Sequence, residues 1–158
     1  LRIFERCRLQ MLLAAGRRQD ALAAAARMLE ACFAKAEREP DPAAEETAAV
    51  LGWLVERGLP EAVDLGMPQP VRDDPLVGYA TALAERSRGA GAKAEELAAA
   101  AFAEPGGTNA EFIDRLQTAV LLVKWGAVDW ADREYKALLE HPGTPVAQFV
   151  PEIGRAHV

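Results

Sequence analysis

A repeat with a period of 37 residues occupies the second half of the sequence and constrains what the chain can fold into. The stretch 111–142 reads as two helices joined at Gly126, and the same pattern occurs 37 positions earlier around Gly89. The matching pairs are Thr81 and Thr118, Ala82 and Ala119, Gly89 and Gly126, Ala90 and Ala127, Ala94 and Ala131, Ala100 and Ala137, and Pro105 and Pro142. A fixed period of this size is typical of helical hairpins that stack into a solenoid. The sequence therefore predicts an all-α chain.

Glycines at the expected turns divide the chain into hairpins. Glycine is common just after the last turn of a helix, because it adopts the left-handed conformation without steric cost. The turn glycines are Gly16, Gly58, Gly89 and Gly126. The predicted hairpins span approximately 1–39, 42–66, 74–105 and 108–142, and a partial repeat follows over 145–158. The second hairpin is degenerate, since its second helix is cut short at Gly66.

Prolines place several helix boundaries. The second helix is predicted to run over 18–39, until Pro40 stops it. At positions 41–42 and 74–75 an aspartate precedes a proline, which combines a favoured N-cap residue with a favoured first helical residue. Two prolines lie close together in the segment 67–73, so we expect this segment to be an extended crossing.

These features resemble the tetratricopeptide repeat (TPR) family. That family has small residues late in the first helix of each hairpin, glycine at the turn, alanines in the second helix and a closing proline. The matching residues are Ala82 and Ala119, Gly89 and Gly126, Ala94 and Ala131, and Pro105 and Pro142. The resemblance implies one domain over 1–158, a right-handed solenoid of about four antiparallel hairpins with the start of a fifth. It also implies that the paired helices bury Ala94 and Ala131 at their crossings, because a larger residue would push them apart.

The charge and hydropathy of the chain argue against two classes of partner. The net charge is −6 and the sequence pI is near 5.0. Nucleic-acid binding needs concentrated lysine and arginine, so we expect no nucleic-acid partner. No apolar run approaches the ~18 residues of a membrane span, so we expect no membrane partner.

The two cysteines, Cys7 and Cys32, are predicted to be free and buried. If they lie on two helices that reverse at Gly16, they are roughly 10 Å apart along the helix axis. A disulfide requires Cα atoms within about 7 Å. Free thiols favour a reducing compartment such as the cytoplasm. The chain begins at Leu1 and not at methionine, so we expect it to be an excerpt of a longer protein or a processed product. No signal peptide is visible.

No motif for catalysis or metal binding is present in the sequence. The two histidines are His141 and His157, and neither belongs to a zinc-protease pattern. Gly89, Gly91 and Lys93 resemble part of a phosphate-binding loop. No strand precedes them, as such a loop requires, and the hairpin turn already explains Gly89. We therefore expect a non-catalytic protein without a metal or cofactor.

The TPR resemblance also implies an interaction groove. In TPR proteins the first helix of each hairpin lines a concave groove. Counting back from the turn glycines assigns to it Ile3, Arg6, Gln10 and Leu13; Glu45, Ala48, Gly52 and Val55; Leu76, Tyr79, Leu83 and Arg86; and Ile113, Leu116, Val120, Val123 and Lys124. The candidate partner-binding residues are Arg6, Gln10, Leu13, Tyr79, Leu83, Arg86, Leu116, Val120, Val123 and Lys124. Because most of these positions are apolar, a groove for a chaperone tail, which needs lysine and asparagine, is not expected.

Two functions fit an apolar groove. The first is a protein-interaction scaffold, a TPR-like module of a larger protein that binds an apolar peptide or amphipathic helix. The alternative is a structural solenoid segment that associates with itself or packs against another domain of the same polypeptide. In that case we expect self-association through the partial repeat 145–158. Arginines also make the first hairpin basic, which would suit an acidic partner.

Overall fold

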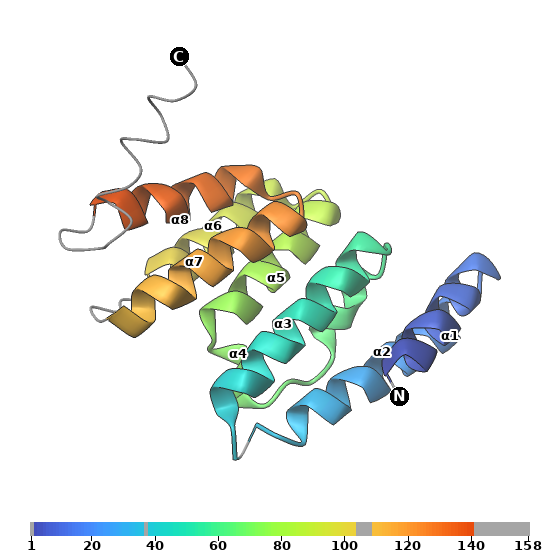
Figure 1. The fold of residues 1–158 in the computed structure, drawn as a ribbon. Helices are drawn as coiled ribbons and strands as arrows, with labels where there is room; N and C mark the ends of the chain where they lie inside the picture. Colours follow the sequence, from blue (N-terminus) through green and yellow to red (C-terminus); the bar gives the residue numbers. More distant parts are fainter. Residues whose placement is uncertain (1, 37, 104–108, 141–158) are drawn as a thin grey trace. The chain divides into compact units, whose positions relative to one another are not determined.

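The computed structural model describes residues 2–36, 38–103 and 109–140, and all regular secondary structure in these ranges is helical (Figure 1). The α-helices are α1 (Arg2–Ala14), α2 (Arg18–Phe33), α3 (Pro40–Glu56), α4 (Gln69–Arg72), α5 (Pro75–Ser87), α6 (Gly91–Ala103), α7 (Asn109–Lys124) and α8 (Val128–Glu140), and a 3₁₀ helix, η1, spans Pro60–Asp64. The all-α prediction is confirmed for these residues. The helices fall into two compact units, divided between 103 and 104.

The predicted turn glycines all end helices in the same way. Each has a positive φ: Gly16 (71°), Gly58 (79°), Gly89 (83°) and Gly126 (75°). In the last of these, the N–H of Gly126 donates to the carbonyl of Val123 at 3.0 Å, and the N–H of Ala127 donates to the carbonyl of Leu122 at 2.9 Å. The same pair of bonds occurs at the other three glycines, which makes all four turns Schellman motifs.

The paired helices approach closely, and small residues lie between them. Helix α1 packs on α2, α5 on α6, and α7 on α8. Ala94 on α6 and Ala131 on α8 have no accessible surface, as predicted. On α5, a Cβ added at Gly78 would lie 3.2 Å from the Cβ of Ala101 on α6, which is closer than nine in ten real Cβ contacts. The approach of α5 to α6 therefore depends on the absence of a side chain at Gly78.

Helix α2 is shorter than the sequence predicts. It ends at Phe33 rather than Glu39, and Pro40 opens α3 instead of stopping α2. The chain tightens after Phe33, since the N–H of Ala36 donates to its carbonyl at 2.9 Å. Proline is tolerated in the first turn of a helix, where its missing N–H has no intrahelical acceptor. The prediction took Pro40 as a helix stop, whereas its conformation suits a helix start.

The segment 67–73 is not fully extended, contrary to prediction. Pro68 has an extended ψ of 144°, but Gln69–Arg72 forms the one-turn helix α4 with Pro70 in its first turn. Val71 of this turn is completely buried. Asp74 then caps α5 as predicted, since its carboxylate accepts a hydrogen bond from the N–H of Leu76 at 2.8 Å.

The core of the first unit lies around α3, which packs against α2, η1, α4 and α5. The largest completely buried side chains there include Leu9, Leu29, Leu51, Leu54 and Tyr79. In the second unit, Trp130 is completely buried together with Ala119 and Leu122. An ion pair joins α7 to α8 there, with Arg115 Nη1 2.7 Å from Glu134 Oε2.

Within the described ranges, no helix is long and apolar enough to cross a membrane. The closing prolines Pro105 and Pro142, His141 and His157, and the partial repeat 145–158 lie outside the described residues. The expectation of one continuous domain over 1–158 stays a prediction, because the helices fall into two compact units.

Candidate interaction surface

The predicted partner-binding residues of the first unit differ widely in exposure. Tyr79 on α5 is completely buried and belongs to the core, so its side chain is not available to a partner. The remaining residues are exposed or half-buried on α1 and α5: Arg6, Gln10, Leu13, Leu83 and Arg86. The sequence pattern alone did not separate Tyr79 from Leu83 and Arg86, which are half-buried on the same helix.

The same correction applies to the groove positions of α3. Ala48, Gly52 and Val55 are buried, and only Glu45 of the four predicted positions is exposed. The physical reason is that α3 has neighbours on several sides, α2, η1, α4 and α5, so the face assigned to a partner is used by the core. Helix α3 therefore contributes little apolar surface at the predicted positions.

In the second unit, the predicted residues form a stripe along α7. Leu116 is half-buried, while Val120 and Val123 expose 55% and 49% of their surface and Lys124 is also exposed. Residues at spacings of four and three share one face of a helix. Whether this stripe continues the surface of α5 stays a prediction, since α5 and α7 belong to different units.

Arg6, another predicted partner-binding residue, already has a partner within the protein. Its guanidinium carbon lies 5.2 Å from the centre of the Trp53 ring on α3, and that of Arg57 lies 5.7 Å from the same ring. Such cation–π contacts stabilise by about 0.5–1 kcal/mol at exposed sites. Arg6 therefore ties α1 to α3, and a partner that used Arg6 would have to compete with Trp53.

Two of the large exposed apolar side chains of α1, Phe4 and Met11, lie opposite its buried side. Leu9 is the only residue of α1 between positions 3 and 14 that is buried. Cys7 and Met11 lie on the opposite side of the helix, two residues before and after it. Phe4 and Met11 expose 81% and 72% of their surface, and Cys7 is also exposed. The expectation that Cys7 is buried was wrong, although both thiols are free.

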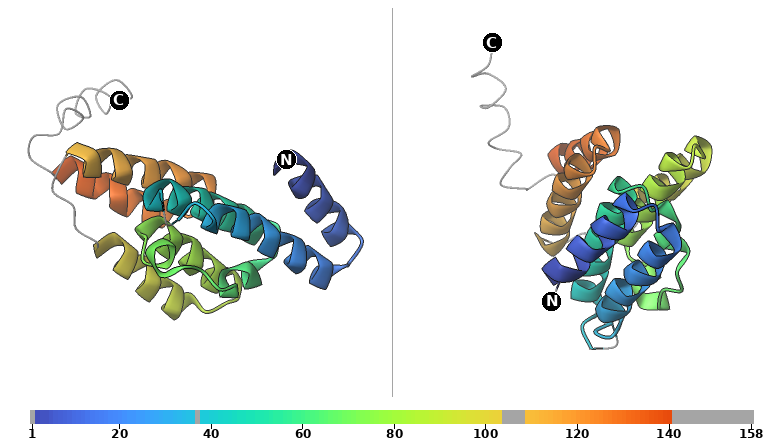
Figure 2. Two further views of the ribbon diagram at one scale, coloured as in Figure 1. Left: turned by 90° about the horizontal axis from the view of Figure 1, so that it is seen from below. Right: turned by 90° about the vertical axis from the view of Figure 1, so that its right-hand side faces the viewer.

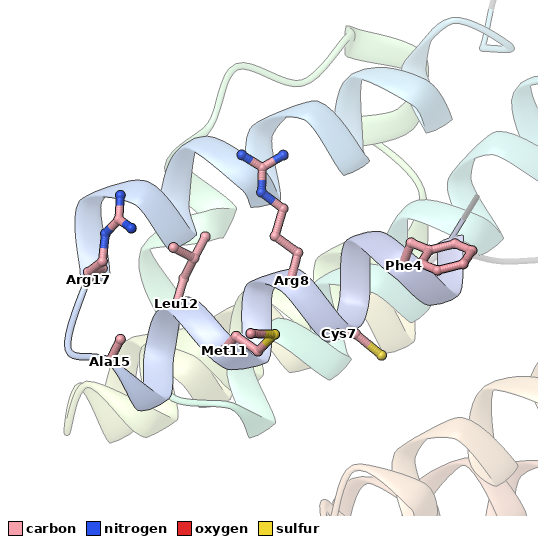
Figure 3. Close-up of a pocket in the computed structure, with 7 residues that line it drawn as sticks. All are labelled: Phe4, Cys7, Arg8, Met11, Leu12, Ala15 and Arg17. Atoms are coloured by element: carbon pink, nitrogen blue, oxygen red, sulfur yellow. The ribbon is translucent and has the colours of Figure 1, made fainter.

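These side chains line an open hollow of about 410 Å³, here called the α1 face. It is lined by Phe4, Cys7, Arg8, Met11, Leu12, Ala15 and Arg17. Figure 3 shows Arg8 and Leu12 on the side toward α2 and Cys7 on the opposite side, with Met11 between them. In the left view of Figure 2, α1 and α2 (both blue) diverge from their connecting turn. This divergence leaves α1 less covered than α3 and α5, which each pack against several other elements of the same unit.

The polar groups of the α1 face are basic. Arg17 forms an ion pair with Asp20, with Nε 2.7 Å from Oδ2. Arg8 has no hydrogen bond or ion pair within the described part of the chain, and its side chain is exposed. A cation beside apolar surface can add charge recognition to hydrophobic contact.

The sequence contained a signal for this surface that the repeat pattern obscured. Phe4, Arg8, Met11 and Ala15 recur at spacings of four, three and four, which places them on one helical face. Counting back from Gly16 selected a different face, that of Arg6, Gln10 and Leu13. Both faces are largely exposed, and the first forms the hollow described above.

A second hollow, of about 320 Å³, lies between the end of α2 and the start of α3. Lys35, Pro42, Glu45, Glu46 and Ala49 line it. Lys35 Nζ lies 3.4 Å from Glu46 Oε2 across this hollow. The lysine and one of the two glutamates that line the hollow therefore already form an ion pair. Over the described ranges, no three histidine, cysteine or acidic side chains lie together as metal ligands would.

The chain was compared with protein-family models, curated proteins and solved structures, and none of them gives a significant match.

Proposed function

We propose that this chain is a non-catalytic protein-interaction scaffold, a TPR-like module that binds a peptide or helix of a protein partner. The proposed architecture is a right-handed solenoid of stacked hairpins. It is supported by the four identical glycine turns and the buried alanines of the paired helices. The proposed function includes no cofactor and no nucleic-acid partner.

Packing between successive hairpins in the first unit supports the same architecture. The second element of one hairpin contacts the first helix of the next, since α2 packs on α3 and η1 packs on α5. Successive first helices also pack on each other, as α3 does on α5. Stacked repeats bury a continuous core in this way and leave the outer faces of helices for binding.

The observation that carries the proposed function is the exposure of the α1 face. Burial of a large apolar side chain stabilises by about 1.5–3 kcal/mol, so exposed ones are a reserve of binding energy. Phe4 and Met11 lie two helical turns apart on this face, with Cys7 between them in the sequence, and both are largely uncovered. Contiguous exposed apolar side chains rimmed by polar groups mark interaction sites on soluble proteins.

The alternative is a structural segment that associates with itself or packs on another domain. It is favoured by a second observation, the apolar surface of the two-helix unit. Val120 and Val123 on α7 are about half exposed, and α8 exposes the stripe Val128, Tyr135 and Leu139. A hairpin with apolar stripes on both helices has more surface to cover than α7 and α8 can provide for each other.

Quantitative affinity enrichment with three variants separates these functions. Met11→Asp places a charge on the α1 face, Val123→Asp places one on α7, and Ala23→Asp places one on the exposed surface of α2 as a control. We expect a partner that binds the native chain and the control, is lost with Met11→Asp, and binds directly when purified. Identical binding by all three variants would contradict the proposal. The alternative would be favoured if the native chain sediments with the mass of a dimer and the Val123→Asp variant sediments with the mass of a monomer.

A further inference from the structure

We infer that the α1 face binds an acidic amphipathic helix, one with an apolar stripe flanked by glutamate or aspartate. This inference rests on the proposed function and specifies the chemistry of the partner.

The shape of the site favours a helical partner over an extended one. The backbone N–H and C=O groups of α1 are used inside the helix, so the surface offers no edge to which a strand could add. From Phe4 to Ala15 the lining residues extend about 16 Å along the helix axis, at ~1.5 Å per residue. A second helix of about three turns, packed along α1, would cover this length with side chains at every third or fourth position.

The charge of the site favours an acidic partner. The charged residues that line the hollow are Arg8 and Arg17, and no acidic residue is among its lining residues, although the chain has a net charge of −6. Arg8 lines the hollow and has no ion pair or hydrogen bond in the described part of the chain. Arg17 also lines it and pairs with the exposed Asp20. A carboxylate on the incoming helix would pair with Arg8 while its apolar stripe covers Phe4 and Met11. Such complementarity selects partners and speeds their association.

A second copy of this chain fits the same face poorly. In a symmetric pair, a twofold axis near the centre of the face would place each Cys7 and Arg8 close to its own counterpart. Two arginines facing each other repel, and repulsion of this kind disfavours one partner relative to another. Nucleic acid is also disfavoured, because the centre of the face is apolar and the chain is acidic overall.

The test uses three synthetic peptides of about 18 residues, stapled to hold them helical. All carry the same leucine stripe, and the flanking positions are glutamate, glutamine or lysine. Binding to the full chain is measured by fluorescence anisotropy of a dye on the peptide. We expect the glutamate peptide to bind about three- to tenfold more tightly than the lysine peptide at low salt. The difference should shrink at high salt, because the charges are exposed.

Charge reversal in the protein locates the effect. Arg8→Glu should reverse the order of the three peptides, whereas Arg27→Glu, the same change on the exposed surface of α2, should preserve it. Circular dichroism confirms that both variants keep their helices. Equal binding of the three peptides, or an unchanged order with Arg8→Glu, would overturn the inference.

A maleimide on Cys7 provides an independent check of the position. Cys7 is exposed and Cys32 is 2% exposed, so a bulky maleimide should modify Cys7 selectively. Modification should abolish binding of the glutamate peptide, and Cys7→Ser should bind it whether or not the reagent is added. Unchanged binding after modification would place the peptide elsewhere and overturn the inference. If no peptide binds but a natural partner is lost with Met11→Asp, the inference fails while the proposed function stands.

Discussion

Arg18, at the start of α2, forms a bidentate ion pair with Glu61 in η1, 43 residues further along the chain. Its Nη2 lies 2.7 Å from both carboxylate oxygens and also donates to the carbonyl of Gly58 at 2.8 Å. From the other side, Arg88 at the end of α5 pairs with Asp64 and donates to the carbonyl of Pro60 at 3.0 Å. The short second element of the degenerate hairpin is thus held by arginines from both neighbouring hairpins.

The Arg18–Glu61 pair predicts a specific dependence of stability on pH. The hydrogen bond from Arg18 lowers the pKa of Glu61 below its usual value of 4.5. A carboxylate with a lowered folded-state pKa stabilises the protein above its unfolded pKa, and this contribution is lost as pH falls through the folded pKa. As pH falls below about 4.5, the usual pKa of the carboxyl, native protein should therefore lose stability more steeply than Glu61→Gln.

Urea unfolding at a series of pH values measures this difference. Because about half of each side chain is exposed, solvent screening keeps the effect below about 1 kcal/mol. Glu30→Gln, on the exposed surface of α2, is the matched control and should follow the native profile. Identical profiles for native protein and Glu61→Gln would show that the ion pair does not stabilise the fold.

Arg88→Gln should destabilise the protein more than Arg18→Gln. Arg88 Nη1 also contacts Glu85 at 3.0 Å, and Glu85 is only 7% exposed. Without Arg88, the buried Glu85 carboxylate keeps Lys93, whose Nζ lies 3.3 Å away, but loses one of its charged partners. We expect this loss to lower the free energy of unfolding by about 1–3 kcal/mol. Loss of the exposed Arg18 contacts should cost less than about 1 kcal/mol. Chemical denaturation of both variants checks the order, and adding Glu85→Gln to Arg88→Gln should recover part of the loss.

The ion pair between Arg115 and Glu134 should behave differently when one or both partners are removed. The side chain of Glu134 is 3% exposed, and that of Arg115 is 22% exposed. Arg115→Leu leaves a buried carboxylate without this partner and should cost about 3–5 kcal/mol. Replacement of both residues by leucine should recover most of this loss, because apolar pairs of similar volume often substitute for buried ion pairs. Thermal unfolding of the two variants tests this, and a double variant less stable than Arg115→Leu would contradict it.

Ala94→Glu should be far more destabilising than the same substitution five residues later in α6. Ala94 is completely buried, whereas Ala99 on the same helix is exposed. Overpacking costs about 1–3 kcal/mol, and burial of a charge adds to it. Ala99→Glu should change the free energy of unfolding by less than about 0.5 kcal/mol. Similar melting temperatures for the two variants would mean that Ala94 does not lie at the crossing of α5 and α6.

The two thiols should differ in reactivity under native conditions. Cys7 should react with a thiol reagent at the rate of an exposed cysteine, while Cys32 should react only when the protein opens. Mass spectrometry after brief labelling should therefore find one added label, and Cys7→Ser should remain unlabelled. Two labels added at similar rates would show that α2 does not protect Cys32.

The features that the sequence determined by itself are those decided within a few residues. The Schellman turns were predictable at Gly16, Gly58, Gly89 and Gly126, because a positive φ favours glycine and the closing hydrogen bonds span five residues. The cap at Asp74 is local in the same sense. The resemblance to the TPR family extended this reach, since it predicted that Ala94 and Ala131 are buried, and both are.

Tertiary structure alone decided which residues remain exposed. Tyr79 and Phe4 are both aromatic residues in the first helices of hairpins, yet Tyr79 is completely buried and Phe4 is 81% exposed. Helix α5 packs against α3, α6 and η1, whereas α1 packs mainly on α2. Periodicity shows that a helix has an apolar face, but it does not give the number of neighbours that cover that face. Burial depends on contacts between residues far apart in the chain, and these contacts leave the α1 face uncovered.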